Sequence, residues 1–300
     1  LKFNDMSPEQ QMDILMNIAD SLVTQSTDYF VAPETFMNNS VWLDNLDEHP
    51  DIIRLRELVY RYPQLKIIIG ATTLQMYASE EEATATARPY RDNQYFDSFN
   101  SALQVDRTPD IPVYHKSELV KKKKKMPYAE YLKFMRKLTL NLGGTFRSHG
   151  TQDYREAFPS PDDSIRVGPV ICYESIFGEF VTDYVEDAGA NFIFVITNDG
   201  WWGDTPGYRQ HNSFSSLRAI ENRRSIARSA NTGISSFFNQ RGDVLQTLGW
   251  WERGGLKQVL YANEELSFYT RYGDFMGRIS LFTGIFILLY TLVGTIIRRK

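Results

Sequence analysis

Apolar and polar residues alternate in blocks that predict helices and strands in turn. Apolar positions three or four residues apart mark one face of a helix, and continuous apolar runs mark buried strands. The helices are expected to begin near Pro8, Ile52 and Ile176, with a long helix over 209–228. The expected strands cover 29–32, 66–70, 111–116, 167–172 and 192–196.

The remaining pattern completes an α/β arrangement. Residues 234–245 predict a hairpin that turns at Arg241 and Gly242, and the polar segment 79–98 predicts a loop. Strands that alternate with helices, and that are apolar throughout, are typical of sheets with helix-covered faces. We therefore predict one α/β domain over residues 1–277.

The C-terminal segment 278–300 has a different character. Its residues 279–297 form an uncharged run of 19, close to the roughly 20 that cross a bilayer. Basic residues 298–300 follow, and this charge predicts a C-terminus in the cytoplasm. The preceding domain would then lie on the other side of the membrane. An apolar helix docked in an oligomer interface is the alternative. No signal peptide stands at Leu1, so we expect an upstream segment that supports export.

Composition narrows the classes of protein that remain. Among 300 residues, 42% are hydrophobic, which excludes a polytopic membrane protein and a disordered chain. The net charge of −4 gives no reason to expect a nucleic-acid partner. One cysteine, Cys172, excludes disulfides and a multi-cysteine zinc site. The four histidines lack metal-ligand spacing, so we predict no metal and no cofactor.

Three short strands end in residues that could carry chemistry: Glu34, Lys116 and Cys172. The ends of such strands are common places for active sites. A cysteine nucleophile needs a base, and the oxyanion that it generates needs a positive charge. The three together suit acyl transfer through a thioester. Taken singly, each has a plainer interpretation: a buried inert thiol, a helix-start glutamate and a solvated lysine.

The sequence around these residues resembles that of a known family. The runs VAPE (31–34), YHKS (114–117) and VICYE (170–174) are similar to the catalytic blocks of the carbon–nitrogen hydrolase (nitrilase) superfamily. The run TNDGWWG (197–203) resembles its membrane-bound branch, the apolipoprotein N-acyltransferases. The resemblance extends from about residue 28 to 300. It implies a nitrilase-like α-β-β-α sandwich, whose first core strand would precede Leu1, followed by one transmembrane helix.

The resemblance also implies an activity. Such an enzyme moves an acyl chain from a phospholipid to the N-terminal amine of a diacylglyceryl-cysteine lipoprotein. Its catalytic domain would lie on the periplasmic side of the bacterial inner membrane. Cys172 matches the nucleophile, Glu34 the general base and Lys116 the residue that stabilises the oxyanion. Tyr173 and Glu174 match supporting positions, with the Tyr173 N–H as a second oxyanion donor.

One position departs from the family pattern. A further active-site glutamate of the family falls, by spacing, at Lys124, inside the lysine run 121–125. Glu130 is a candidate substitute a few residues later. The lysine run is either a solvated loop or a contact for anionic phospholipid headgroups. Core packing is the default interpretation for a tryptophan, and the adjacent Trp201 and Trp202, which follow a strand end, are the expected exception and candidate lipid contacts.

Two rival functions stay open at this point. One is a membrane-tethered, nitrilase-like amidase that uses water as the acceptor. The other is a non-catalytic relative that serves as a binding or scaffold protein. This second alternative is supported by the lysine run that stands where the family has an acidic residue.

The departure at Lys124 generates a test. We expect Lys124→Glu to preserve or raise the rate of acyl transfer, because it restores a carboxylate where the family has one. The measurement is acylation of a diacylglyceryl lipopeptide by the two proteins side by side. A large loss of activity would contradict this and give the lysine run a role of its own.

Overall fold

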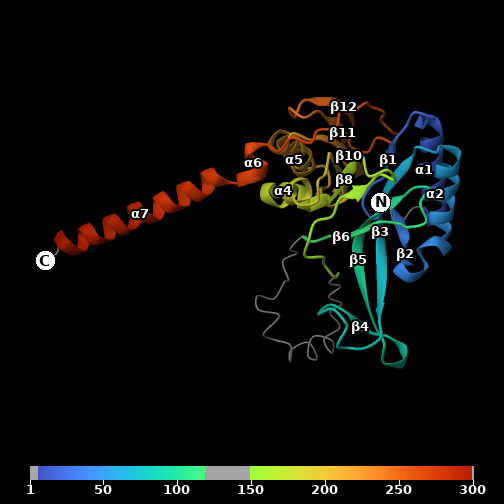
Figure 1. Cartoon of the computed structure of the whole chain (residues 1–300), viewed down its shortest axis with the longest axis horizontal. Helices are drawn as coiled ribbons and strands as arrows, with labels where there is room; N and C mark the ends of the chain where they lie inside the picture. The colour runs from blue at the N-terminus through green and yellow to red at the C-terminus, as the bar shows by residue number, and fades with distance from the viewer. Residues whose placement is uncertain (1–5, 119–148, 299–300) are drawn as a thin grey trace.

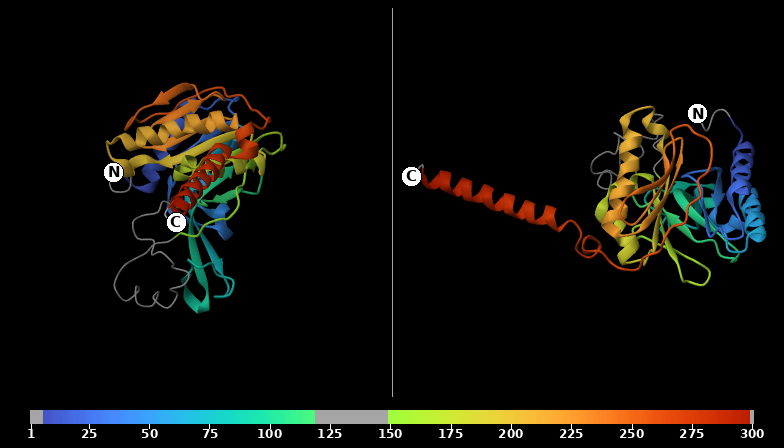
Figure 2. Two further views of the ribbon diagram at one scale, coloured as in Figure 1. Left: turned by 90° about the vertical axis from the view of Figure 1, so that its left-hand side faces the viewer. Right: turned by 90° about the horizontal axis from the view of Figure 1, so that it is seen from above.

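Two six-stranded sheets pack face to face, and helices cover their outer faces. The computed structural model describes residues 6–118 and 149–298, so Lys124 and Glu130 lie outside the described residues. In the right-hand view of Figure 2 the early, blue helices and the later, yellow helices lie on opposite sides of the sheets. The predicted α-β-β-α layering is therefore confirmed.

The first sheet is built around one long central strand, β3. This strand pairs with β1 and β2 in parallel and with β5 antiparallel. β4 and β6 both pair with β5. The strands are β1 (Tyr29–Val31), β2 (Met37–Trp42), β3 (Lys66–Tyr77), β4 (Arg88–Pro89), β5 (Tyr95–Val105) and β6 (Val113–His115).

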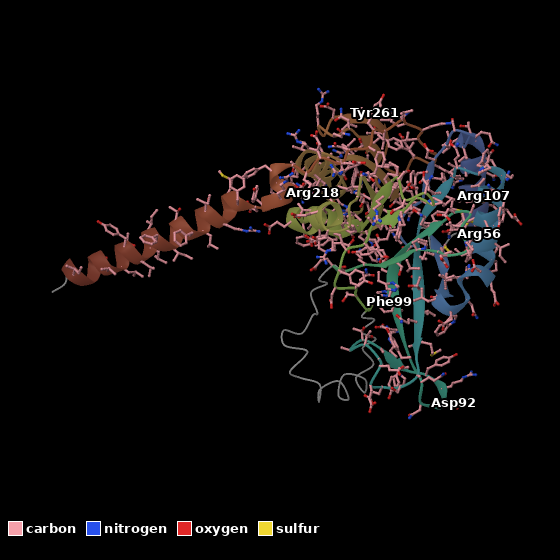
Figure 3. All side chains as sticks on the ribbon, in the orientation of Figure 1. Arg56, Asp92, Phe99, Arg107, Arg218 and Tyr261 are labelled. Carbon is pink, nitrogen blue, oxygen red and sulfur yellow. The ribbon has the colours of Figure 1, made fainter. Side chains whose placement is uncertain are left out.

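Helices α1 (Pro8–Leu22) and α2 (Pro50–Arg61) cover the outer face of this sheet. α1 begins at Pro8, where the sequence predicts a helix start, and it has Ser7 as N-cap, a capping box and a proline in the first turn. Arg56, labelled in Figure 3, connects α2 to the segment after β5. Its guanidinium donates to the carbonyl oxygens of Asp106 and Pro109.

The second sheet has the order β12-β11-β10-β9-β8-β7. Its middle strands β8, β9 and β10 run parallel, and β10–β11–β12 are antiparallel. The strands are β7 (Phe158–Pro159), β8 (Arg166–Ile171), β9 (Phe192–Asn198), β10 (Ser225–Asn231), β11 (Ser235–Phe238) and β12 (Val244–Leu248). The antiparallel pair β11–β12 confirms the predicted hairpin.

Helices α4 (Gly178–Glu186) and α5 (Pro206–Asn222) lie on the outer side of the second sheet (Figure 1). Short 3-10 turns connect the elements: η1 (Leu43–Glu48), η2 (Arg91–Asn93), η4 (Cys172–Ile176) and η5 (Asp199–Trp202). Two of these, η4 and η5, directly follow the strands β8 and β9.

Two expectations about individual elements are wrong. The helix expected over 209–228 ends at Asn222, because Arg223 adopts a left-handed conformation (φ 52°) and the chain then enters β10. Helical and strand periodicity are hard to separate where a helix is followed at once by a strand. The expected loop 79–98 also contains β4 and the start of β5.

The C-terminal helix α7 (Phe275–Arg298) extends away from the sheets (Figure 1). Its segment 275–295 is long and apolar enough to cross a membrane, and none of its most apolar stretch is buried. The structure thus has the C-terminal candidate span that the sequence predicted. Its orientation in a membrane, the domain boundary at residue 277 and an upstream first strand stay predictions.

A cavity of about 1340 Å³ opens beside the edge strand β1. Its walls come from α1, β10 and the extended segment 251–262, and they include Arg107 and Tyr261 (Figure 3). None of Glu34, Lys116 and Cys172 lines it. Pro33 and Arg228 do line it, so the cavity adjoins the residues next to the candidate site.

Gly70 in β3 provides a test of how closely the strands approach. A Cβ atom here would overlap the backbone of Glu34 and Thr35. We expect Gly70→Ala to lower the free energy of unfolding by about 1–3 kcal/mol, because backbone must shift to admit the methyl group. Urea unfolding measures the change.

The matched control is Gly254→Ala, whose added Cβ would lie 3.6 Å from the nearest atom, in ordinary contact with Leu248. If both variants unfold at the same urea concentration as the unchanged protein, the close approach at Gly70 is not a constraint.

Candidate active site

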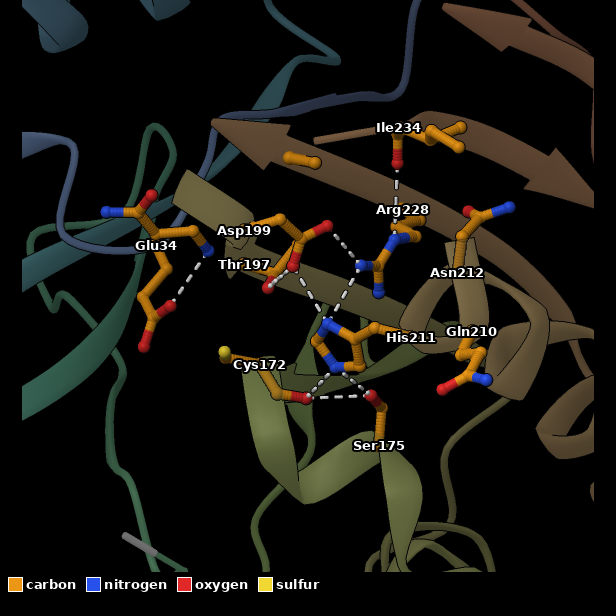
Figure 4. A network of polar contacts seen from close by, with 12 residues as sticks. Glu34, Cys172, Ser175, Thr197, Asp199, Gln210, His211, Asn212, Arg228 and Ile234 are labelled. Carbon is orange, nitrogen blue, oxygen red and sulfur yellow. Dashed lines mark hydrogen bonds and ion pairs between the residues drawn. The ribbon is translucent and has the colours of Figure 1, made fainter. Parts of the chain in front are cut away.

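Glu34 is held by groups from both sheets. Its side chain follows the end of β1 and is buried. Oε1 accepts hydrogen bonds from Lys116 Nζ (2.9 Å) and Asn100 Nδ2 (2.7 Å). Oε2 accepts one from the backbone N–H of Asn198 (2.9 Å), at the end of β9 (Figure 4). The carboxylate therefore lies where the ends of strands from the two sheets meet.

Glu34 and Lys116 form a buried ion pair. Burial alone raises the pKa of Glu34, but the Lys116 charge and hydrogen bonds from Lys116, Asn100 and the Cys172 thiol lower it overall. Burial lowers the pKa of Lys116, but the charge of Glu34 and the hydrogen bond to it raise that pKa above its ordinary value. Both groups are consequently charged at neutral pH, and each compensates the other.

Cys172 stands at the junction of β8 and η4 with a left-handed backbone (φ 53°). Such a conformation costs free energy for a residue with a side chain, and it is common at functional sites. Figure 4 shows the sulfur on the side that faces Glu34. Burial first, and then the negative charge of Glu34, raise the pKa of the thiol to about 12, against the opposing effect of Lys116. The resting cysteine is a thiol that needs a base.

Glu174 connects the strands that carry Lys116 and Cys172. Its Oε1 accepts from the Tyr114 hydroxyl (2.9 Å) and from the backbone N–H of Ser117 (2.7 Å). Its Oε2 accepts from the backbone N–H of Ile171 (2.8 Å). Burial raises its pKa, and these donors and the Lys116 charge only partly oppose that rise. Glu174 therefore sets the spacing between β6 and β8.

Tyr173 is half-buried, and its ring packs edge-on against Phe177 at 5.6 Å. Its backbone N–H lies in the first turn of η4, where helical N–H groups have no acceptor within the helix. This group is thus available to a ligand at Cys172.

Trp201 and Trp202 lie in η5, immediately after β9. Trp201 is 71% exposed and Trp202 41% exposed. Neither is a core residue, as expected for this pair. Their contact with lipid stays a prediction.

Asn100 was missed by the sequence analysis, although it donates to Glu34. It lies on β5, a strand that the apolar pattern did not reveal because aromatic and polar residues are mixed in its first half. A polar residue on an inward-facing strand position would have been the signal. In the described ranges, 6–118 and 149–298, no group of three or more His, Cys, Asp or Glu side chains is arranged to hold a metal ion.

The chain is similar to known proteins in sequence and in fold. The model of the carbon-nitrogen hydrolase family matches residues 5–272. An apolipoprotein N-acyltransferase of Chlorobaculum tepidum is 27% identical over 93% of this chain and 52% of its own length. One of Bdellovibrio bacteriovorus is 31% identical over 82% of this chain and 43% of its own. The chain thus spans about half the length of the curated relatives it matches.

A solved structure shares the fold. An amidase from Nesterenkonia sp. aligns with a TM-score of 0.54 at 13% sequence identity, over 92% of this chain and 91% of its own. At this identity the likeness concerns the fold alone.

The charges around Cys172 generate a prediction about its reactivity. We expect the rate of Cys172 alkylation by iodoacetamide to rise steadily between pH 7 and 10, because a thiol with a pKa of about 12 is mostly protonated in that range. Glu34→Gln removes the negative charge that raises this pKa. The variant should react roughly three- to tenfold faster at pH 8, since each unit of lowered pKa adds tenfold thiolate but reduces its nucleophilicity.

The control is Glu57→Gln, which removes an exposed carboxylate on α2. Mass spectrometry of the peptide that contains Cys172 follows the reaction. Unchanged alkylation of Glu34→Gln would show that Glu34 does not govern the thiol. Slower alkylation would contradict the expected effect of its charge and show that Glu34 acts on the thiol mainly as a base.

Proposed function

The chain belongs to the carbon–nitrogen hydrolase family, and on that premise we propose that it is an N-acyltransferase that works through a thioester on Cys172. The acyl donor is a phospholipid and the acceptor is the N-terminal amine of a diacylglyceryl-cysteine lipoprotein. One observation carries the proposal: a buried Glu34–Lys116 ion pair of 2.9 Å beside a buried free cysteine. The names of the relatives support the choice of acceptor over water.

Acylation begins with Glu34, which is ionised, and the Cys172 thiol, which is not. Glu34 accepts the thiol proton while the sulfur attacks the ester carbonyl carbon of the phospholipid, so that a C–S bond forms. The oxyanion of the tetrahedral intermediate is stabilised by the Lys116 ammonium and the Tyr173 N–H. The ester C–O bond then breaks, and Glu34 returns the proton to the lysophospholipid oxygen.

Deacylation reuses the same groups in the opposite order. The acceptor amine attacks the thioester carbonyl carbon and forms a C–N bond, while Glu34 accepts one proton from the amine. The C–S bond breaks, and Glu34 returns that proton to the sulfur. Over the two half-reactions every proton and bond is accounted for, and the only protein groups that act are Glu34, Lys116, Cys172 and the Tyr173 N–H.

Several features suit a membrane substrate. The candidate span α7 would tether the domain, with the catalytic residues on the periplasmic side and the C-terminus in the cytoplasm of a bacterial inner membrane. The exposed Trp201 and Trp202 suit the interface between water and lipid, where tryptophan is favoured. The lysine run 121–125 supplies charge for anionic headgroups.

Mass spectrometry tests the proposal on the full-length protein in detergent. After incubation with phospholipid vesicles, we expect an acyl adduct on the peptide that contains Cys172. Addition of a diacylglyceryl lipopeptide should discharge it with formation of the amide. Cys172→Ser should turn over at less than roughly 0.1% of the unchanged rate, because removal of a nucleophile has losses of this order or larger.

A urea unfolding curve for Cys172→Ser is the control for folding. Discharge of the adduct to water instead of to the lipopeptide would favour a membrane-tethered amidase. A folded protein that forms no adduct would overturn the thioester proposal and favour a non-catalytic relative.

A further inference from the structure

A buried polar cluster lies behind Cys172, on the side away from Glu34 (Figure 4). Asp199, His211 and Arg228 form it, from η5, α5 and β10, and none is more than 3% exposed. His211 Nδ1 lies 2.8 Å from Asp199 Oδ1, and Arg228 Nη2 donates to Asp199 Oδ2 at 2.8 Å. Arg228 Nη2 also lies 3.2 Å from His211 Nδ1.

The far edge of the imidazole reaches the backbone of the nucleophile. His211 Nε2 lies 3.1 Å from the carbonyl oxygen of Cys172. A carbonyl oxygen only accepts hydrogen bonds, so Nε2 is the donor in this contact, and the Ser175 hydroxyl oxygen lies 3.1 Å from the same nitrogen. The Ser175 hydroxyl donates to the same oxygen at 2.7 Å. Two side chains therefore hold this one carbonyl group.

Holding that oxygen determines the direction of the next N–H. The peptide between Cys172 and Tyr173 is planar, and in the trans form its C=O and N–H point in opposite directions. With the oxygen drawn towards His211, the Tyr173 N–H points away from the cluster. The left-handed conformation of Cys172 makes such support necessary, because the backbone does not favour it unaided.

We propose that His211 is a positioning residue, which fixes the Cys172–Tyr173 peptide so that the Tyr173 N–H serves as an oxyanion donor. Asp199 and Arg228 hold the imidazole in place, and the Ser175 hydroxyl donates a second hydrogen bond to the same carbonyl oxygen. A hydrogen bond to the carbonyl oxygen also polarises the peptide, which strengthens its N–H as a donor. The proposal rests on the thioester chemistry proposed above.

Two reactions of Cys172 separate positioning from a merely structural role. Acylation by an ester builds up an oxyanion, whereas alkylation by iodoacetamide is a displacement at carbon that has none. A misdirected N–H therefore slows acylation and spares alkylation. A loosened or partly unfolded site changes both rates.

The experiment compares the full-length protein with His211→Ala, and follows acylation by p-nitrophenyl acetate and alkylation by iodoacetamide at the same pH. We expect acylation to fall by about 10²-fold, the order of loss when one oxyanion donor is removed. Alkylation should stay within about twofold of the unchanged rate. Ser175→Ala removes the second donor to the Cys172 carbonyl oxygen and a hydroxyl 3.1 Å from His211 Nε2, and it should show the same split with a smaller loss.

His49→Asn is the matched control, because His49 caps α2 far from Cys172 and asparagine can also accept the capping hydrogen bond. It should leave both rates unchanged. Parallel losses of acylation and alkylation in His211→Ala, or unchanged acylation, would overturn the positioning role. An unchanged protein that is acylated by p-nitrophenyl acetate but not by phospholipid would refute the proposed function and leave this test intact.

Discussion

The buried ion pair between Glu34 and Lys116 is the interaction on which the rest of the site depends. Removing two charges from water costs several kcal/mol for each, and the cost is recovered only if the pair is well hydrogen-bonded. Here Asn100 and the backbone N–H of Asn198 satisfy the carboxylate. Because Asn198 belongs to the second sheet, the same carboxylate also fixes how the two sheets meet.

Cys172 is placed by three independent supports. Cys172 directly follows the end of β8. Glu174, in the same turn η4, accepts hydrogen bonds from the backbone of Ile171 in β8 and of Ser117 just after β6. His211 and Ser175 hold its carbonyl group from behind. Since the left-handed backbone at Cys172 is unfavourable, the surrounding contacts supply the free energy that keeps the sulfur facing Glu34.

The candidate span is attached to the catalytic part of the molecule through a second polar contact. Glu179, in the first turn of α4, accepts a hydrogen bond from the backbone N–H of Asp274 (2.8 Å) and forms an ion pair with Arg278. The start of α7 is therefore connected to a helix that follows the nucleophile turn by a few residues.

The sequence by itself determined the alternation of strands and helices, the candidate span and the three residues at strand ends. Local apolar patterns carry this information, because burial of one face is decided within a few residues of chain. The resemblance added the chemical roles. Glu34, Lys116 and Cys172 could thus be named in advance, although their separation of more than 50 residues from one another left their contact unstated.

Only the tertiary structure decided which polar groups support these three. Asn100 reaches Glu34 across 66 positions of chain, and His211 reaches Cys172 across 39. The same holds for the extent of β5 and the end of α5, where pairing with neighbouring strands overrides the local pattern. Hydrogen bonds between distant segments depend on strand order and register, and no local pattern of residues encodes either.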